Sequence, residues 1–235
     1  MRDDQTIEVR VAVAAVGAVA LLVPAALIGV LIVGDVGWLH RIDLRVTGAG
    51  HGWAAGHPGW VRFMEIWCLV FDPNSWRVAA LGLVIWLARR RAWALAVWVA
   101  ATMTAGGVLG AVLKLLVGRH RPDLLDPVAR ASGYSFPSGH ALNNALAASV
   151  FLLVLLPVFA RRRAFLWAGA IVIPLITGLS RIGLGVHWTS DVVAGWLLGV
   201  AVTAATATAY LSWRSRRRRR NPHPVLEGLE PGVGG

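Results

Sequence analysis

Cysteine and charged residues are scarce in this sequence. Of its 235 residues one is a cysteine, Cys68, and 15% are Asp, Glu, Lys or Arg, whereas 57% are hydrophobic. A single cysteine excludes an intrachain disulfide and a multi-cysteine metal site, and we expect Cys68 to be a buried small residue. So little charge is atypical of a water-soluble domain. The composition therefore predicts one membrane domain, since several spans of about 20 residues use most of this length.

Long charge-free runs mark the expected spans. An additional apolar stretch, 60–88, is broken by the turn-forming run Asp72-Pro73-Asn74-Ser75. We assign its second half as a span and its first half, Trp60 to Phe71, as a short helix at the interface or against the bundle. The sequence thus predicts an all-α, integral membrane six-helix bundle within residues 1–213. The approximate spans are 11–34, 73–88, 92–116, 141–160, 164–181 and 191–213.

Arginine clusters orient this bundle. Four groups hold 14 of the 23 basic residues: Arg2 with Arg10, Arg89 to Arg91, Arg161 to Arg163, and Arg214 with Arg216 to Arg220. With six spans, all four groups fall on one side, which the positive-inside rule makes cytoplasmic. Both termini are then cytoplasmic, and the loops after the first, third and fifth spans are outside. The net charge of +11 is explained by topology, and we expect no nucleic-acid partner.

Two segments fall outside the expected helices. Residues 35–58 are glycine-rich and contain three histidines in a spacing that matches no metal motif: His40, His51 and His57. We expect an outer loop there. Residues 214–235 are rich in arginine and then in proline and glycine, which predicts a disordered cytoplasmic tail attracted to anionic headgroups.

The first of three polar clusters on the outer side spans residues 114–122. Lys114 and Arg121 are seven residues apart, two turns or about 10.5 Å along a continuous helix, and so could face one anion. Gly118 and Pro122 indicate that the helix ends inside this stretch. The remaining basic residues are expected to be peripheral: Arg119 and His120. Alone, this cluster would be explained by side chains that reach toward lipid headgroups.

The second cluster is Pro137-Ser138-Gly139-His140, directly before an apolar run. This order places Ser138 and Gly139 at a helix N-terminus, where free amide N–H groups bind phosphate. Glycine permits close backbone approach, and Ser138 adds a hydroxyl donor. The alternative is an ordinary capping serine followed by an interfacial histidine.

The third cluster contains Ser180, Arg181, His187 and Asp191. His187 and Asp191 are four residues apart and share one face of a helix. An aspartate that binds one imidazole nitrogen fixes the tautomer and leaves the other nitrogen free to attack as a neutral nucleophile. An isolated His/Asp pair is more often structural than catalytic, so this assignment depends on the other two clusters.

In order, the clusters give Lys114-x6-Arg121-Pro122, Pro137-Ser138-Gly139-His140 and Ser180-Arg181-x5-His187-x3-Asp191. This three-part pattern resembles the type 2 phosphatidic acid phosphatase family, the membrane branch of a superfamily that also contains bacterial acid phosphatases and vanadium haloperoxidases. The resemblance spans about 114–191 by motif.

The resemblance implies a role for each site residue. His187 would attack phosphorus, Asp191 would orient it, and His140 would protonate the leaving oxygen and later activate water. Five residues would bind the phosphoryl group: Lys114, Arg121, Ser138, Gly139 and Arg181. No metal or cofactor is implied.

The expected partners are a phosphorylated lipid and the bilayer. A site at the outer ends of the spans would admit a lipid from the outer leaflet, such as phosphatidic acid, phosphatidylglycerol phosphate or a polyprenyl diphosphate. The expected location is a bacterial plasma membrane, with the catalytic face extracytoplasmic. The sequence does not specify the oligomeric state.

Three alternatives stay open. The chain could transfer the phosphoryl group from His187 to an acceptor hydroxyl, which product analysis would detect. It could be a haloperoxidase, which would oxidise halide only with vanadate. It could also be a transporter whose basic outer pocket binds an anion without chemistry.

Overall fold

The computed structural model describes residues 2–124 and 132–220, and these residues form helices without a β-strand among them. The all-α expectation is confirmed. The α-helices, with one short 3-10 turn (η1), are α1 (Arg2–Val33), α2 (Gly37–Ala55), α3 (Pro58–Val70), α4 (Pro73–Arg89), α5 (Trp93–Val117), α6 (Gly139–Leu155), η1 (Ala160–Arg162), α7 (Arg163–Gly183) and α8 (Thr189–Arg220).

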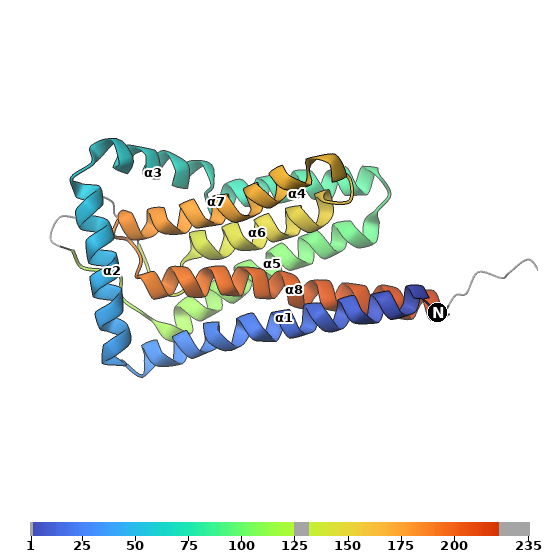
Figure 1. Cartoon of the computed structure of the whole chain (residues 1–235), viewed down its shortest axis with the longest axis horizontal. Coiled ribbons are helices and arrows are strands. Elements are labelled where there is room, and N and C mark those ends of the chain that lie inside the picture. Colours follow the sequence, from blue (N-terminus) through green and yellow to red (C-terminus); the bar gives the residue numbers. More distant parts are fainter. Residues whose placement is uncertain (1, 125–131, 221–235) are drawn as a thin grey trace, which may run out of the picture.

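The long helices lie side by side as a bundle, and α2 lies across one end of it (Figure 1). The N-terminal end of α1 and the C-terminal end of α8 lie together at the opposite end. Within residues 2–124 and 132–220, five segments are long and apolar enough to cross a membrane: Val11–Val33, Pro58–Arg89, Trp93–Val117, Ala160–Gly183 and Thr189–Arg217. The apolar helix Gly139–Leu155 is shorter. These segments are those of a multi-pass membrane protein.

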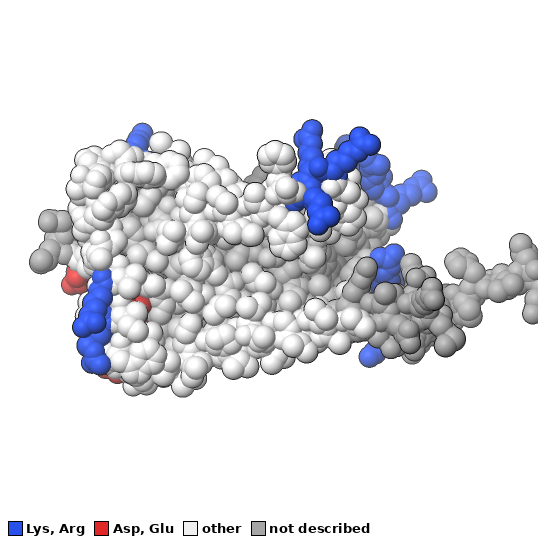
Figure 2. Space-filling model, in the orientation of Figure 1, with Lys and Arg blue, Asp and Glu red and all other residues white. Residues whose placement is uncertain are grey.

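The outer surface of the bundle is apolar along its length. Large hydrophobic side chains on α1, α5 and α7 are exposed, among them Val16, Leu115 and Phe165. Figure 2 shows Lys and Arg side chains near the two ends of the molecule and an uncharged surface between them. An apolar band bounded by charge matches the hydrocarbon core between two headgroup layers.

Helix α6 is the centre of the bundle and packs against α4, α5, α7 and α8. Glycines on α8 allow its backbone to approach α6 closely: a Cβ at Gly199 would lie 2.5 Å from the Leu142 carbonyl oxygen, and one at Gly195 would lie 2.9 Å from the Ser138 oxygen. Small residues four apart are a common device for close helix packing in membranes. This approach brings the N-termini of α6 and α8 together.

The break between α3 and α4 is stabilised by a buried amide. Pro73 interrupts the helix, and the freed carbonyl of Phe71 accepts a hydrogen bond from Asn144 Nδ2 at 2.8 Å. The Asn144 oxygen in turn accepts from Trp76 Nε1 at 2.9 Å and from Thr177 Oγ1 at 3.3 Å. Backbone groups at membrane depth need such internal partners, so the break is held in a fixed position beside α6.

The structure corrects three expectations. Residues 37–55 form helix α2, not a loop. The buried face of this helix contains polar residues, Asp43, Thr47 and His51, so a search for apolar residues at helical spacing does not detect it. The tail is helical as far as Arg220, and residues 221–235 lie outside the described residues. The helix expected over 141–160 ends at Leu155, just before Pro157.

The short helix expected at 60–71 is present as α3, and it packs on α7.

Candidate active site

The three polar clusters meet at the end of the bundle that α2 covers. The C-terminal ends of α5 and α7 lie there with the N-terminal ends of α6 and α8, as Figure 1 shows. A backbone hydrogen bond of 3.0 Å from Ser138 N to the Asp191 carbonyl joins the starts of α6 and α8. Residues far apart in the sequence thus share one site.

His187 lies in the turn before α8, and its side chain is buried. Its Nδ1 atom lies 3.3 Å from Ser135 Oγ and 3.6 Å from Asp191 Oδ2. Its Nε2 atom lies 3.1 Å from Arg121 Nη1. Because a guanidinium only donates, Nε2 is the acceptor and Nδ1 carries the hydrogen. The nitrogen with the free electron pair therefore faces the cationic side of the site.

Asp191 is the centre of a buried hydrogen-bond network. Its Oδ2 atom accepts hydrogen bonds from the Trp188 amide at 3.0 Å and from the Ser135 hydroxyl. Its Oδ1 atom accepts from Arg119 Nη1 at 2.7 Å. Ser135 thus contacts both the carboxylate and the imidazole of His187. The carboxylate is held from several directions, which fixes its position relative to His187.

Arg119 is not peripheral, contrary to the expectation from sequence. Its guanidinium joins Asp191 to Asp43 of α2, with Nη2 2.6 Å from Asp43 Oδ2, and both carboxylates are fully buried. It also stacks over the ring of Trp188 at 5.4 Å. A planar fork with several donors suits such a bridge. His120 contributes through its backbone, since its carbonyl accepts from Trp188 Nε1.

Helix α2 caps the start of α8 from outside. The amide of Thr189 donates to Thr47 Oγ1 at 3.1 Å, and the amide of Ser190 donates to Asp43 Oδ1 at 2.8 Å. The first amides of a helix have no partner within it, and here side chains four residues apart on α2 provide one. Helix α2 therefore fixes the position of His187 and Asp191 through their own helix.

Lys114 and Arg121 converge on one acceptor. Lys114 Nζ lies 2.7 Å from the Tyr134 carbonyl oxygen, and Arg121 Nη2 lies 3.4 Å from the same atom. Helix α5 ends at Gly118, whose φ of +60° is a left-handed cap. The turn that follows brings Arg121 back toward Lys114, so these two cations can share one oxygen although they are not on one continuous helix.

The remaining phosphate-site candidates lie at the start of α6 and at the end of α7. Ser138 is the N-cap of α6, and its hydroxyl accepts a long hydrogen bond from the Ala141 amide at 3.4 Å. Gly139 is the first helical residue, and a Cβ there would meet nothing within 4 Å. Arg181 lies at the end of α7, and its buried Nε atom has no hydrogen-bond partner among the described residues.

His140, the second residue of α6, faces the break between α3 and α4. Its Nε2 atom lies 3.5 Å from Oδ2 of Asp72, the N-cap of α4. Asn144, one turn further along α6, holds this break through the Phe71 carbonyl. The packing thus gives the imidazole a carboxylate neighbour across the break between α3 and α4.

Two residues of the site that lie between helices, Arg121 and His187, both have lowered pKa values. Burial lowers the pKa of His187 to about 4, and the charges of Arg121 and Arg181 act in the same direction, while Asp191 opposes them. Burial and the charge of Arg181 also lower the pKa of Arg121. His187 is therefore a neutral imidazole at pH 7, as a nucleophile must be.

The parts of the chain that the structure describes were also compared with the side-chain groups that bind metal ions. Over 2–124 and 132–220, no three His, Cys, Asp or Glu side chains form a group that could hold a metal ion. The cations of the site are side chains of the chain itself.

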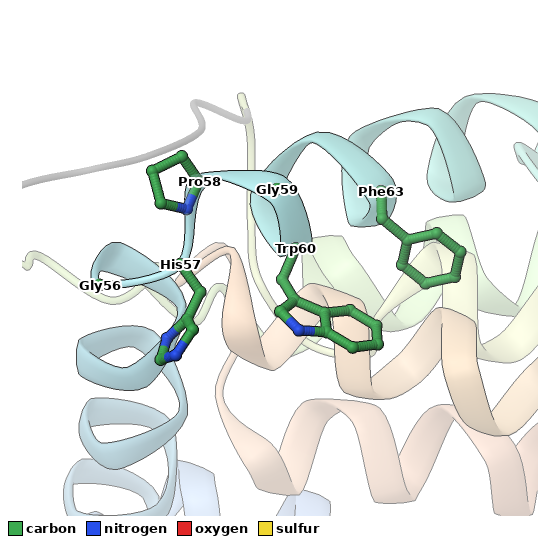
Figure 3. A pocket seen from close by; sticks show the side chains of 6 residues that line it. All are labelled: Gly56, His57, Pro58, Gly59, Trp60 and Phe63. Atoms are coloured by element: carbon green, nitrogen blue, oxygen red, sulfur yellow. The ribbon is translucent and has the colours of Figure 1, made fainter.

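A hollow of about 640 Å³ lies elsewhere, at the corner between α2 and α3. It is lined by His57, Pro58, Trp60 and Phe63, with two glycines (Figure 3). His57 stacks on Trp53, and its Nδ1 donates a hydrogen bond to the Trp53 carbonyl at 2.7 Å. Aromatic rings gathered at the end of a bundle are typical of the headgroup layer. We assign this corner to the membrane interface.

Four site residues were missed from sequence: Asp43, Thr47, Asp72 and Ser135. The sequence offered a possible signal for Asp43 and Asp72, since a carboxylate in an apolar chain is costly unless it has a partner. Thr47 and Ser135 had none, because threonine and serine are ordinary in turns and at bundle interfaces. Arg119 was noted but misplaced, since only the fold shows which carboxylates it meets.

The fold and the site together are those of a helical membrane protein in which a buried histidine, the candidate nucleophile, lies near cationic side chains. Residues 95–217, more than half of the chain, match the model of the PAP2 superfamily. The chain belongs to the PAP2 superfamily.

Two curated relatives are similar over the motif region. Phosphatidylglycerophosphatase B of Bacillus subtilis is 40% identical over 96 residues, 40% of this chain and 47% of that protein. Undecaprenyl-diphosphatase of Sulfolobus acidocaldarius is 37% identical over 99 residues, 39% of this chain and 44% of that protein. The chain thus spans less than half the length of these two relatives.

Two other comparisons cover more of the chain. Decaprenylphosphoryl-5-phosphoribose phosphatase of Mycobacterium tuberculosis is 34% identical over 146 residues, 61% of this chain and 75% of that protein. The crystal structure of a transmembrane PAP2-type phosphatidylglycerolphosphate phosphatase from Bacillus subtilis matches with a TM-score of 0.70 and 22% identity, over 88% of this chain and 98% of that one. The structural match shows a shared fold.

Proposed function

We propose that this protein is a metal-independent lipid phosphatase that hydrolyses a phosphomonoester or diphosphate through a phosphohistidine on His187. The observation that carries the proposal is the orientation of His187: Nδ1 faces Ser135 and Asp191, and Nε2 faces Arg121. An imidazole held on one side by a carboxylate network, with its free electron pair toward cations, is arranged to attack an anionic phosphorus centre.

In the first step, the Nε2 electron pair of His187 forms a bond to phosphorus, and the bond from phosphorus to the lipid oxygen breaks. That oxygen takes a proton from His140. In the second step, water gives a proton to His140 and attacks phosphorus, the phosphorus–nitrogen bond breaks, and phosphate leaves. The proximity of Asp72 to His140 supports this role, because a carboxylate neighbour fixes the orientation and the tautomer of an imidazole.

The phosphoryl oxygens would be bound by Lys114, Arg121 and Arg181 and by the α6 N-terminus at Ser138 and Gly139. Three cations against a phosphate monoester of about −2 leave capacity for charge that redistributes in the transition state. Positioned donors of this kind commonly provide the largest part of the rate enhancement. The shared contact of Lys114 and Arg121 with one carbonyl oxygen supports their joint binding of a phosphoryl oxygen.

The proposed topology keeps six spans and both termini in the cytoplasm. The second span is α3 with α4, in place of residues 73–88 alone, because Pro58–Arg89 together are long and apolar enough to cross a membrane. Basic clusters lie at the α4–α5 turn, at the α6–α7 connection and at the end of α8. The positive-inside rule places that side in the cytoplasm. The site would then lie at the outer face of a bacterial plasma membrane and receive a lipid from the outer leaflet.

The test is a panel of lipid phosphates incubated with the purified protein in detergent and excess EDTA. The panel contains phosphatidic acid, phosphatidylglycerol phosphate and a polyprenyl diphosphate. We expect phosphate release by the wild type, a loss of at least a thousandfold in His187→Ala, and near-normal release in the control His57→Ala. A labelled phosphoryl group should also be trapped on the wild-type protein by acid-free quenching.

Each other outcome has a distinct meaning. Release that persists in His187→Ala would contradict the assigned nucleophile. Activity abolished by EDTA would contradict the metal-free scheme. Transfer of label to an added acceptor alcohol in preference to water would identify a phosphotransferase. Binding of phosphate without release from any substrate would leave only an anion-binding or transporting role.

A further inference from the structure

A long apolar groove lies between α1 and α5, with a volume of about 480 Å³. All the residues that line it are apolar. They include Leu22 and Gly29 of α1, Leu113 and Leu116 of α5, Phe136, and Leu198 of α8. The groove exists because α1 packs along α8 and hardly touches α5.

The groove is about as deep as one leaflet of a bilayer. On α1 its lining runs from Leu22 to Val33, roughly 16 Å at 1.5 Å per residue. Half of a hydrocarbon core of about 30 Å is about 15 Å. Val33 ends α1 at the site end of the bundle, so the groove runs from the level of the site toward the middle of the membrane.

The end of the groove nearest α2 lies next to the candidate active site. Phe136 lines the groove, and the preceding residue, Ser135, hydrogen-bonds to both His187 and Asp191. On α5, Leu113 lines the groove and is followed directly by Lys114, whose ammonium group points to the Tyr134 carbonyl. The Lys114 ammonium group thus lies beside the end of the groove that is nearest the site.

We propose that this groove binds the hydrocarbon chain of the substrate, so that the substrate is an amphiphile with a phosphorylated head and a chain of about one leaflet's length. This inference rests on the proposed function. Charge complementarity selects the occupant: an anionic head fits the cations at the mouth, and only an apolar chain can fill the part below them without loss of polar contacts.

Gly29 gives the sharpest test of the groove. A Cβ at this position would lie 3.6 Å from the Phe136 ring, an ordinary contact, so a larger side chain would extend along the groove without a backbone clash. Gly29→Leu should therefore fold and obstruct the chain. Gly17→Leu is the matched control, because nothing lies within 4 Å of a Cβ at Gly17 on the same helix.

A second control fills a different groove. Ala101 lines an apolar hollow of about 520 Å³ between α5 and α8 at the other end of the bundle. Ala101→Leu should change lipid contacts in general without affecting a chain whose head lies at His187.

The experiment compares two substrates with one head: long-chain phosphatidic acid in mixed micelles and its water-soluble dihexanoyl analogue. For Gly29→Leu we expect kcat/KM to fall on the order of tenfold for the long-chain substrate, chiefly through KM. For the dihexanoyl substrate we expect a change within about twofold. Both controls should behave as the wild type on both substrates.

The groove assignment would be overturned if Gly29→Leu affected both substrates equally, or neither, in a well-folded and monodisperse protein. Inactivity of the wild type on every phosphate ester would instead refute the proposed function, so the two failures are distinguishable. Should Gly29→Leu not fold, Ala26→Leu, another lining residue, replaces it.

A direct measurement on the wild type needs no variant. A phosphatidic acid with a photoreactive group near the chain end should label the groove around Leu22 and Leu109, the end far from the site. Excess unlabelled substrate should suppress this labelling. Labelling spread evenly over the lipid-facing helices, without competition, would refute the inference.

Discussion

Arg119 connects two fully buried carboxylates, and its removal should damage both folding and catalysis. Its side chain is 11% exposed, whereas those of Asp43 and Asp191 are 0% exposed, and the two ion pairs measure 2.6 and 2.7 Å. Arg119→Ala would leave two uncompensated buried charges. The loss of one partner from a buried pair typically costs about 3–5 kcal/mol, so we expect a clear fall in melting temperature.

The Arg119→Ala substitution should slow the chemical step without weakening substrate binding to the same extent. Arg119 bonds to Asp191 and not to the proposed phosphate ligands, so its loss should misplace the carboxylate network that orients His187. We expect kcat to fall on the order of a hundredfold with KM little changed. Arg119→Lys should recover only part of this loss, because one ammonium cannot replace a planar fork that binds two carboxylates.

A double-mutant cycle tests the coupling itself. Asp43→Ala removes one of the charges that Arg119 compensates, so the double variant Arg119→Ala/Asp43→Ala should be less destabilised than the sum of the single variants. The control is Arg45→Ala on the same helix, an exposed arginine whose loss should change stability by less than about 0.5 kcal/mol. The assays are thermal unfolding in detergent and steady-state phosphate release. Additive effects, or a stable Arg119→Ala protein with normal kcat, would refute this reasoning.

Two further predictions concern His187 and the packing of α7. The imidazole of His187, followed by NMR in detergent, should titrate near pH 4, and Arg121→Gln should raise that pKa because a neighbouring positive charge is lost; an unchanged or lower value would contradict the contact. Because the pKa in the folded state is lowered, the His187 contribution to stability should decrease as pH falls from about 6.5 to about 4. Gly178→Ala should destabilise the protein by about 1–3 kcal/mol, since its Cβ would lie 2.2 Å from the Trp196 ring, whereas Gly169→Ala on the same helix, with its nearest contact at 3.9 Å, should be tolerated. Equal melting temperatures for these two variants would argue against the close packing of α7 on α8.

Apolar runs and short motifs were enough to predict the all-α class, the membrane environment and the three clusters that carry the motif pattern. Each of these depends on residues near one another in the chain: apolar runs of bilayer length, a serine and glycine before a helix, and a histidine four residues before an aspartate.

The way in which those clusters are held depends on how the helices pack. Asp43 and Ser190 are 147 residues apart, and Arg119 and Asp191 are 72 apart, so no local pattern records their contact. Helix α2 escaped notice because the stripe that it buries against α8 contains carboxylate and hydroxyl groups, whereas hydrophobic periodicity detects only apolar stripes. Polar partners inside a membrane protein are chosen by which helix ends the packing brings together, and the glycines that allow α8 to approach α6 acquire that meaning only in the folded chain.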